Sequence, residues 1–425
     1  MSTESELLTT EKEQKEIENI INKYKEQGIY LGESLNQDAL KKGYAIHNAG
    51  LLPSQKQLIE ELFQKKLVKV VLATETLSAG INMPAKTTVI SSPRKPSSTT
   101  DGGDDHKRNL TPNEFHQMAG RAGRRGIDTE GFCFALTCNP EQTKFYNELI
   151  SSPSNKLESN LDIDYSFITN YLAQFSNKDE LRYLLSKSLY AYTPNGRSEK
   201  NLDKLIKAFE VKKNILIKES FIDKNSKLTT KGELIKNLNG YEQIPIINII
   251  GDKALDGLNP IQLAGIIGGL ANIRQGIKED LPQKPFTIKE NFDEVFKMVA
   301  EKASNEVSKY IKDISELYPD RDLELKSSTM EHLYKWAELN SVNSNRRKNW
   351  KELYSGELRS SIKDEGSLFK EITATADLLK QLVEVSNVGE AYSELDSDKT
   401  YYRNLRLNLQ EALRLIEKDS SGNII

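Results

Sequence analysis

The segment around residue 120 combines fixed positive charge with bare backbone. Residues 115–128 read FHQMAGRAGRRGID and contain three arginines and three glycines. In a helix, Arg121 and Arg124 would lie on one side, where two guanidinium groups can hold phosphate oxygens through paired N–H donors. The other interpretation is a basic helix end that is solvated or paired with carboxylates.

Three neighbours of these arginines fit a phosphate partner. Gln117 precedes Arg121 by one helical turn, so its amide could orient a water or a phosphate oxygen. Gly120 and Gly123 carry no Cβ, and they leave room for a ligand to approach the backbone closely. Together these residues predict a site for a polyphosphate.

A second polar segment follows an apolar run. Residues 70–90 read VVLATETLSAGINMPAKTTVI, and Thr74 stands where the chain leaves a predicted buried strand. Open α/β sheets bind ligands at that edge, where a hydroxyl and free backbone amides suit a phosphodiester. Gly80 permits a tight turn, and Asn82 could bond to a ribose hydroxyl. Alternatively, Thr74 only caps the next helix and Gly80 only marks a turn.

Alternating elements must position these two segments. An amphipathic helix is predicted over residues 10–27, and further helices over residues 54–66 and around 112–124. Short apolar runs between them predict strands at residues 43–47, 68–74, 87–92 and 131–137. This alternation indicates a parallel sheet covered by helices, with residues 93–109 as a flexible surface loop.

The sequence beyond residue 140 predicts mainly helices. A connector of mixed polarity leads to residues 221–238, where two short extended pieces and a threonine-capped helix are typical of a winged helix. Long helices follow, and one of them carries an apolar stripe of Leu368, Ile372, Leu379 and Leu382.

Composition excludes several classes of protein. The chain has 425 residues, enough for two to four domains, and a formal net charge of −3, so any polyanion must bind a local basic strip. No apolar run approaches the roughly 20 residues that cross a bilayer, and we expect a cytoplasmic protein without membrane partners. The two cysteines, Cys133 and Cys138, are too few for a metal site, and we expect them to be buried thiols.

The order of three motifs adds a resemblance to these inferences. GYAIHNAGLLPSQKQLIEELF, VVLATETLSAGINMPAKTTVI and TPNEFHQMAGRAGRRGID resemble the second RecA-like domain of superfamily 2 helicases, and within them the superkiller-type DExH-box group. The resemblance is strong over residues 43–138 and continues more weakly through DEGSLFKEITATADLLKQL. It implies an incomplete RecA-like parallel α/β domain (1–140), a connector with a winged helix (141–260) and a C-terminal helical bundle (261–425).

The resemblance also implies roles for single residues. Arg121 and Arg124 would contact the γ-phosphate of ATP, one of them as an arginine finger, and Gln117 would place the attacking water. The residues expected to bind the nucleotide are Asn82, Gly120 and Gly123. Those expected to line the path of a nucleic-acid strand are His47, Asn48, Thr74, Gly80 and Lys370. His47 could equally be a core histidine, and the helix of Lys370 could serve only packing.

A complete motor needs residues that this sequence lacks. It contains neither a G-x-x-x-x-G-K-[ST] phosphate loop nor a D-E-x-H motif to hold magnesium. ATP and Mg²⁺ are therefore expected only with a first RecA-like domain, supplied in trans or lost by truncation, and the chain alone should not hydrolyse ATP. We expect part of an ATP-dependent RNA helicase acting on single-stranded RNA. The alternatives are a non-enzymatic nucleic-acid- or protein-binding remnant, or a fragment of a DNA helicase.

Overall fold

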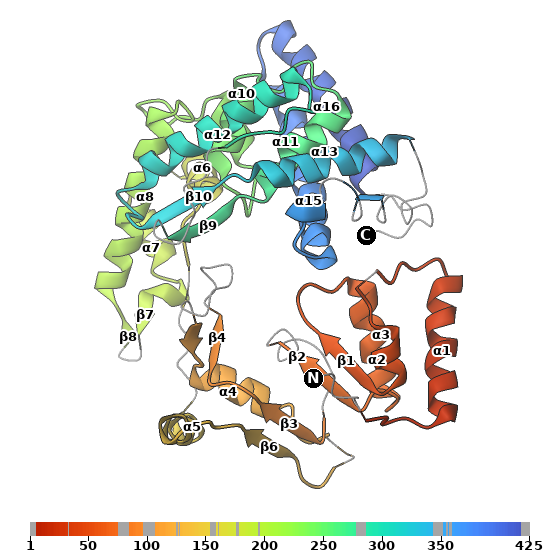
Figure 1. Ribbon diagram of the computed structural model, residues 1–425. Coiled ribbons are helices and arrows are strands. Elements are labelled where there is room, and N and C mark those ends of the chain that lie inside the picture. Colours follow the sequence, from red (N-terminus) through yellow and green to blue (C-terminus); the bar gives the residue numbers. More distant parts are fainter. Residues whose placement is uncertain are drawn as a thin grey trace. The chain divides into compact units, whose positions relative to one another are not determined.

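The computed structural model describes most of the chain. The described residues are 6–32, 34–74, 85–96, 107–124, 126, 128–153, 159, 161–175, 178–193, 196–277, 286–342, 352–353, 356 and 359–417. The chain divides into two compact units (Figure 1). Unit 1 consists of Met1–Lys156 and Ile362–Phe369, and unit 2 of Leu157–Ser361 and Lys370–Ile425. The division into three domains stays a prediction.

The first part of unit 1 packs three helices against a parallel strand pair. Its elements are α1 (Glu11–Glu26), α2 (Gln37–Lys41), β1 (Tyr44–His47), α3 (Pro53–Gln64) and β2 (Val70–Ala73). Thr10 caps α1 in a reciprocal capping box with Glu13. The predicted apolar stripe of α1 is confirmed, because Ile17 and Ile21 are buried in one core with Leu58 and Leu62 of α3.

The second part of unit 1 packs two helices against another parallel strand pair and adds an antiparallel hairpin. Its elements are β3 (Thr87–Ile90), β4 (Arg94–Pro96), β5 (Lys107–Asn109), α4 (Pro112–Ala119), β6 (Phe132–Ala135) and α5 (Pro140–Ser151). Ile90, Phe115, Tyr146 and Leu149 form its core. The expectation of an irregular loop over residues 93–109 was wrong at both ends, since β4 and β5 pair as an antiparallel hairpin. Residues 97–106 lie outside the described part.

The two four-residue strand pairs of unit 1 are parallel, as the alternation of elements predicted. β1 pairs with β2 and β3 pairs with β6, and among the described residues these remain separate two-stranded sheets. One face of each sheet is covered by helices. Ala45 of β1 is buried towards the core of α1 and α3, and Ile90 of β3 is buried towards α4 and α5.

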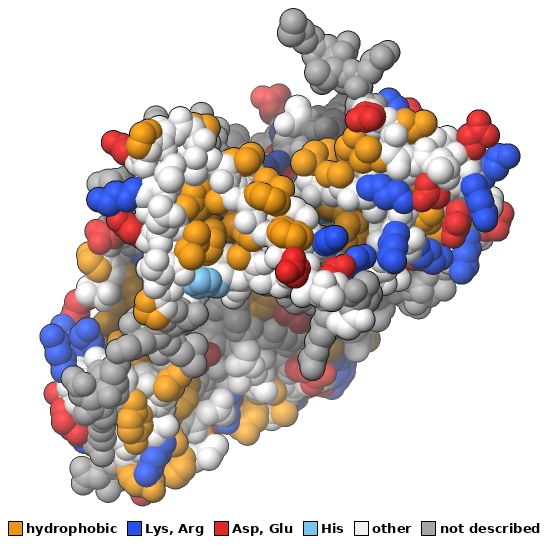
Figure 2. Space-filling view, turned by 90° about the horizontal axis from the view of Figure 1, so that it is seen from below, with side chains coloured by type: hydrophobic (Ala, Val, Ile, Leu, Met, Phe, Trp, Pro, Cys, Tyr) orange, Lys and Arg blue, Asp and Glu red, His pale blue; other side chains and the backbone are white. Residues whose placement is uncertain are grey.

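The opposite face of each sheet is apolar and exposed. Ile46 lies opposite Leu72 in the β1–β2 register, and their side chains are 55% and 62% exposed. Val89 lies opposite Phe134, which stacks on Phe132, and these three side chains are also exposed. In Figure 2, apolar side chains (orange) gather over part of the surface seen from below. Parallel sheets are normally covered on both faces, but among the described residues these two faces are exposed to solvent.

The exposed cysteines belong to the same region. Cys133 lies on β6 and Cys138 follows that strand, and both are exposed, so the expectation of two buried thiols was wrong. Within the described residues, no group of three or more His, Cys, Asp or Glu side chains is placed to hold a metal ion.

Unit 2 is built mainly of helices. Its elements are α6 (Tyr165–Gln174), α7 (Lys178–Leu185), η3 (Leu189–Ala191), β7 (Tyr192–Thr193), β8 (Gly196–Arg197), α8 (Glu199–Lys218), α9 (Thr230–Ile235), α10 (Gln243–Gly251), α11 (Pro260–Ala271), β9 (Arg274–Ile277), α12 (Glu294–Ile314), β10 (Arg321–Glu324), α13 (Ser327–Val342), η4 (Arg359–Ser361), α15 (Glu365–Tyr392, whose start belongs to unit 1) and α16 (Asp396–Glu417). No helix of the described chain is both long and apolar enough to span a membrane.

Residues 221–238 adopt part of the predicted winged-helix pattern. Ile222 and Leu228 form an isolated antiparallel bridge around a turn, and Thr229 caps α9 by accepting a hydrogen bond from Gly232. A single bridge is less than a wing of paired strands, so the winged helix stays a prediction.

The helical bundle packs around α11, which contacts α13 and α16. Trp336 of α13 is fully buried, and its indole nitrogen donates to the carbonyl of Ile416. The predicted stripe of α15 is also confirmed, because Leu368, Ile372, Leu379 and Leu382 are all buried.

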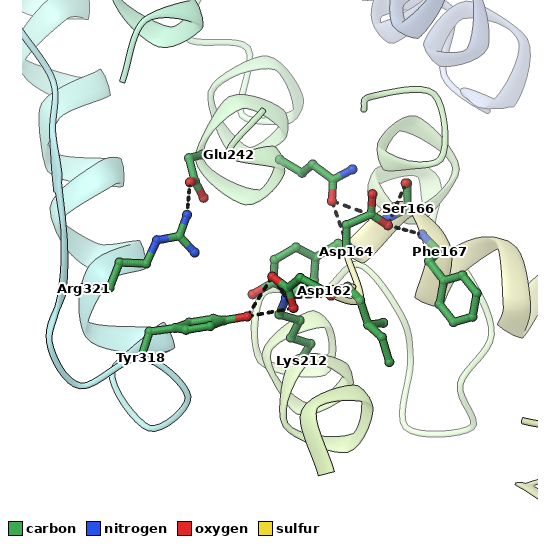
Figure 3. Close-up of polar contacts among 11 residues, drawn as sticks. Asp162, Asp164, Ser166, Phe167, Lys212, Glu242, Tyr318 and Arg321 are labelled. Carbon is green, nitrogen blue, oxygen red and sulfur yellow. Dashed lines mark hydrogen bonds and ion pairs between the residues drawn. The ribbon is translucent and has the colours of Figure 1, made fainter. Parts of the chain in front are cut away.

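A polar cluster binds the residues just before α6 to the rest of unit 2. The amine of Lys212 on α8 is buried and donates to both carboxylate oxygens of Asp162, at 3.0 and 3.1 Å, and to the carbonyl of Ile163. Tyr318 also points at Asp162, and its hydroxyl donates at 2.8 Å (Figure 3). The residues just before α6 are thereby bound to α8 and to the segment before β10.

A second ion pair lies beside this cluster. Arg321 of β10 points at the carboxylate of Glu242, which precedes α10 (Figure 3). Burial raises the pKa of Glu242, and the charge of Arg321 opposes that shift. The side-chain amide of Gln275 on β9 donates to the same carboxylate at 2.8 Å. These polar contacts join β9 and β10 to the residue that precedes α10.

Candidate functional site

The arginine segment begins on α4. Pro112 occupies the first turn, and Thr111 forms a capping box with Glu114, so the helix start is fixed by its sequence. Phe115 is buried against Tyr146 of α5, which anchors the helix in unit 1. Gln117 is exposed on the same helix, where it remains open to a ligand.

The arginines themselves lie beyond the helix, which corrects the sequence prediction. The helix was expected around residues 112–124, but α4 ends at Ala119 and Gly120 is its C-cap. The chain then turns and forms a backbone bridge with Ala85, just before β3. The N–H of Ala85 donates to the carbonyl of Arg121 at 3.0 Å, and the N–H of Gly123 donates to the carbonyl of Ala85 at 2.7 Å. Arg121 and Arg124 are therefore held by a backbone bridge and not by helical spacing.

Backbone geometry explains one of the two glycines expected to bind nucleotide. Gly123 has φ +89°, in the left-handed region that favours glycine, and a Cβ there would lie 3.3 Å from the Cα of Gly131. Gly131 packs against Ala122 and Gly123 so closely that its own Cβ would lie 2.6 Å from their atoms. Gly120 has φ −67°, an ordinary helical value. The requirement at Gly123 comes from a tight backbone crossing, whether or not a ligand is bound.

Arg124 is paired with a carboxylate of its own loop. Its Nε and Nη2 donate to the two oxygens of Asp128 at 2.7 and 2.6 Å, and its backbone N–H donates to Asp128 at 3.0 Å. These hydrogen bonds hold the pKa of Asp128 well below its usual range. In this structure the guanidinium group of Arg124 is therefore occupied by Asp128, and its expected contact with the γ-phosphate stays a prediction. Asp128 stands four residues after Arg124, and this spacing was the overlooked signal.

The second polar segment begins at Thr74, where the parallel strands β1 and β2 end at the same edge of their sheet. Thr74 follows β2 and is exposed, and its backbone N–H donates to the carbonyl of His47 at the end of β1. The expectation that this strand is buried was wrong, because Val70 and Leu72 on the uncovered face of the sheet are exposed. Gly80 and Asn82 lie outside the described residues, so their expected contacts with strand and nucleotide stay predictions.

His47 lies in the core and does not line a strand path. Its side chain is 1% exposed, and Nε2 is 3.6 Å from a carboxylate oxygen of Glu60 on α3. Burial lowers the pKa of His47, and the charge of Glu60 opposes this shift only in part. The alternative interpretation of a core histidine is thus the correct one for its side chain.

Asn48 and Lys370 occupy different settings. The side-chain oxygen of Asn48 accepts the backbone N–H of Gly50 at 2.9 Å and shapes the loop after β1. Lys370 is exposed on α15, in the part of that helix that belongs to unit 2. Its exposure is compatible with the expected contact to a nucleic-acid backbone.

Comparison with known proteins agrees with these features. The helicase conserved C-terminal domain matches residues 5–126, and the DSHCT (NUC185) domain matches residues 225–398. Residues 43–138, where the motifs are strongest, overlap the first match, and α15 lies within the second.

Several curated relatives share part of this sequence. The chain is 37% identical over 180 residues to the DExH-box ATP-dependent RNA helicase DExH9 of Arabidopsis thaliana, covering 42% of this chain and 17% of the relative. It is 40% identical over 158 residues to the antiviral helicase SKI2 of Saccharomyces cerevisiae, covering 37% and 12%. Against the human exosome RNA helicase MTR4 it is 37% identical over 153 residues, covering 36% and 14%. The matched segment thus spans less than a fifth of each relative.

Proposed function

We propose that this chain, which belongs to the superkiller-type DExH-box helicase family, supplies the second RecA-like domain and a strand-guiding bundle to an ATP-dependent RNA helicase. In this role, nucleotide binding between two lobes moves single-stranded RNA along the chain. The family's two C-terminal domains support the proposal. Coupling of hydrolysis to movement is the proposed part.

The observation that carries the proposal is the anchored arginine loop. Two backbone hydrogen bonds to Ala85 fix residues 121–123, so the side chains of Arg121 and Arg124 leave from a backbone of defined position. Preorganised guanidinium groups are what a developing phosphoryl charge requires. We assign Arg121 to the γ-phosphate and Gln117 to the attacking water.

Arg124 can serve the same phosphate only by changing partners. Its two N–H donors are held by Asp128, and a phosphate offers the same paired acceptors. We assign Arg124 to a switch from carboxylate to phosphate when nucleotide binds. In the nucleotide-free chain the pair keeps the loop in shape.

The rest of the nucleotide site belongs to another lobe. Donors for phosphate are present, but the sequence has no phosphate loop and the described residues form no metal-binding group. We therefore assign Mg²⁺ and most of the triphosphate to a first RecA-like domain, with Asn82 proposed at the ribose. When bound, the ion would neutralise phosphate charge there.

The proposed strand contacts are to phosphate and sugar. Thr74 at the strand edge, Asn48 in the loop after β1 and Lys370 on α15 are the candidates, with Gly80 proposed beside Thr74. Such contacts do not read sequence, which suits movement along any strand. We choose RNA over DNA because DExH9 and MTR4 are both described as RNA helicases.

RNA-stimulated ATPase activity tests the proposal directly. The full chain is assayed alone and mixed with a phosphate-loop domain from a family member; we expect activity only in the mixture. Arg121→Ala should abolish that activity while RNA binding, followed by fluorescence anisotropy, changes less than about twofold. Arg403→Ala, at an exposed ion pair of α16, is the matched control. Hydrolysis by the chain alone would contradict the assignment of the phosphate loop to a partner.

One observation favours the alternative of a non-enzymatic binding remnant. The Arg124–Asp128 pair satisfies a guanidinium group without nucleotide, as in a loop that has only a structural role. In that case the mixture stays inactive, Arg121→Ala has no effect on hydrolysis, and RNA binding persists.

A further inference from the structure

We infer that the first turn of α15 is a coupling joint, in which Glu365 is a positioning residue that locks the start of the strand-facing helix to the loop after β1. The role of the joint in movement rests on the proposed function. The joint itself is inferred from hydrogen bonds and packing within the structure. Ile362–Phe369 belongs to unit 1 and the rest of α15 to unit 2, so one helix passes from one unit into the other.

A buried carboxylate forms the centre of the joint. Glu365 is fully buried, and its two oxygens accept hydrogen bonds from the hydroxyls of Tyr30, at 3.0 Å, and Ser34, at 2.9 Å. The carboxylate also lies in the first turn of α15, where the helix dipole favours negative charge. A carboxylate is costly to bury unless such donors are in place. Its contacts therefore specify one docked position for the helix start.

The receiving surface is itself fixed by hydrogen bonds. The side chain of Gln55, fully buried at the start of α3, donates to the carbonyl of Leu31 at 2.8 Å and to the hydroxyl of Ser34 at 3.1 Å. A Cβ at Gly32 would overlap both the Glu365 carboxylate and the Gln55 amide. The pocket for Glu365 is thus lined by groups that are held by hydrogen bonds of their own.

Backbone contacts join the helix start to the loop after β1. The N–H of Gly366 donates to the carbonyl of Gly50 at 3.0 Å, and a Cβ on Gly366 would lie 2.6 Å from the carbonyl carbon of Gly50. A Cβ on Gly50 would in turn lie 2.8 Å from the carboxyl carbon of Asp364. Asn48 caps the same loop through the N–H of Gly50. Two glycines without side chains are needed at this crossing.

The joint links two groups that are proposed to touch the strand. Asn48 lies in the loop that receives the helix, and Lys370 lies five residues after Glu365 on the same continuous helix. Because Gly366 is hydrogen-bonded to Gly50, we expect a movement of the loop after β1 to be passed to the start of α15. In the proposed mechanism α15 passes this movement on to the helical bundle. Breaking the joint should therefore uncouple ATP hydrolysis from movement of the strand.

Hydrogen exchange of the full chain tests the joint without RNA or ATP. Glu365→Gln and Gly366→Ala should raise amide exchange of residues 362–369 by about tenfold or more, with a smaller rise in residues 30–55, and leave residues 378–390 unchanged. Glu384→Gln changes an exposed carboxylate of the same helix and is the control. Unchanged exchange of residues 362–369 in both joint variants would overturn the inference, as would an equal rise along the whole of α15.

Coupled activity tests the role of the joint in the complemented enzyme. With the phosphate-loop domain present, Glu365→Gln should keep RNA-stimulated ATPase within about twofold and lower strand displacement about tenfold or more. An equal loss of both activities, or of neither, would overturn the coupling role. If the wild-type mixture is inactive, the proposed function and the coupling role both fail, and the exchange result still decides whether the joint exists.

Discussion

The carboxylate of Asp128 forms a bidentate ion pair with the guanidinium group of Arg124, which lies four residues earlier in the same loop. The loop therefore carries less available positive charge than its sequence indicates. A nucleotide that recruits Arg124 has to compete with an acceptor of the same paired geometry.

Asp128→Asn should release this charge. The amide keeps one acceptor and loses the negative charge, so we expect the variant to elute from heparin at higher salt than the wild type. Asp396→Asn, at an exposed position in the first turn of α16, changes the net charge equally and should shift elution less. In the double variant Asp128→Asn/Arg124→Ala the gain should disappear. Equal shifts in Asp128→Asn and Asp396→Asn would show that only net charge matters.

Three glycine variants should show whether backbone strain or steric overlap makes alanine destabilising in the loop between α4 and β6. Gly126→Ala meets no atom within 4 Å but has φ +77°, so it should lower the free energy of unfolding by about 1 kcal/mol through strain alone. Gly131→Ala meets backbone at 2.6 Å and should destabilise through overlap. Gly123→Ala combines positive φ with contact at 3.3 Å and should exceed Gly126→Ala. Urea unfolding gives the order; equal effects of Gly123→Ala and Gly126→Ala would contradict the contact argument.

Glu13 should make unit 1 sensitive to acid. Hydrogen bonds from Lys69 and from Thr10 lower the pKa of Glu13 from 4.5 to about 2. Because the folded pKa lies below the unfolded one, the stabilisation is complete above about pH 4.5 and is lost as the pH falls towards 2. Glu13→Gln should lower the melting temperature near neutral pH, and the difference from wild type should shrink on acidification. Glu16→Gln, exposed on the same helix, should show no such trend.

Lys212→Met should destabilise unit 2. The buried amine makes three hydrogen bonds to Asp162 and Ile163, and its loss removes all three, although Tyr318 still donates to Asp162. Asp162 is 55% exposed and can be rehydrated, so we expect about 1–3 kcal/mol rather than the larger cost of a fully buried pair. Denaturant unfolding measures the change, and Lys207→Met on the exposed side of α8 is the control. An equal effect of both substitutions would show that the polar cluster contributes little.

Sequence periodicity predicted the elements well and their ends less well. The four strands of the two parallel pairs and the apolar stripes of α1 and α15 all follow from patterns within one element, but the apolar run of β2 did not show that its strand is exposed. The end of α4 does not follow from such a pattern, because it depends on Ala85, more than 30 residues away in sequence, which offers the chain a backbone bridge just beyond Ala119.

The candidate site shows the same limit. Residue types indicated phosphate chemistry at Arg121 and Arg124, but the Asp128 contact depends on a turn that no helical template contains. The burial of His47 depends on α3, whose Glu60 approaches the strand from another part of the sequence. Glu365 carried no signal at all, since a glutamate at a helix start is ordinarily a solvated residue.

The two bare sheet faces have a consequence for how the chain can be produced. Exposed apolar surface of this kind promotes aggregation while a chain is being made. Here it includes Ile46, Leu72, Val89 and Phe134. Because contacts between copies become more frequent as the chain accumulates, the yield of monomeric protein should fall as its concentration rises.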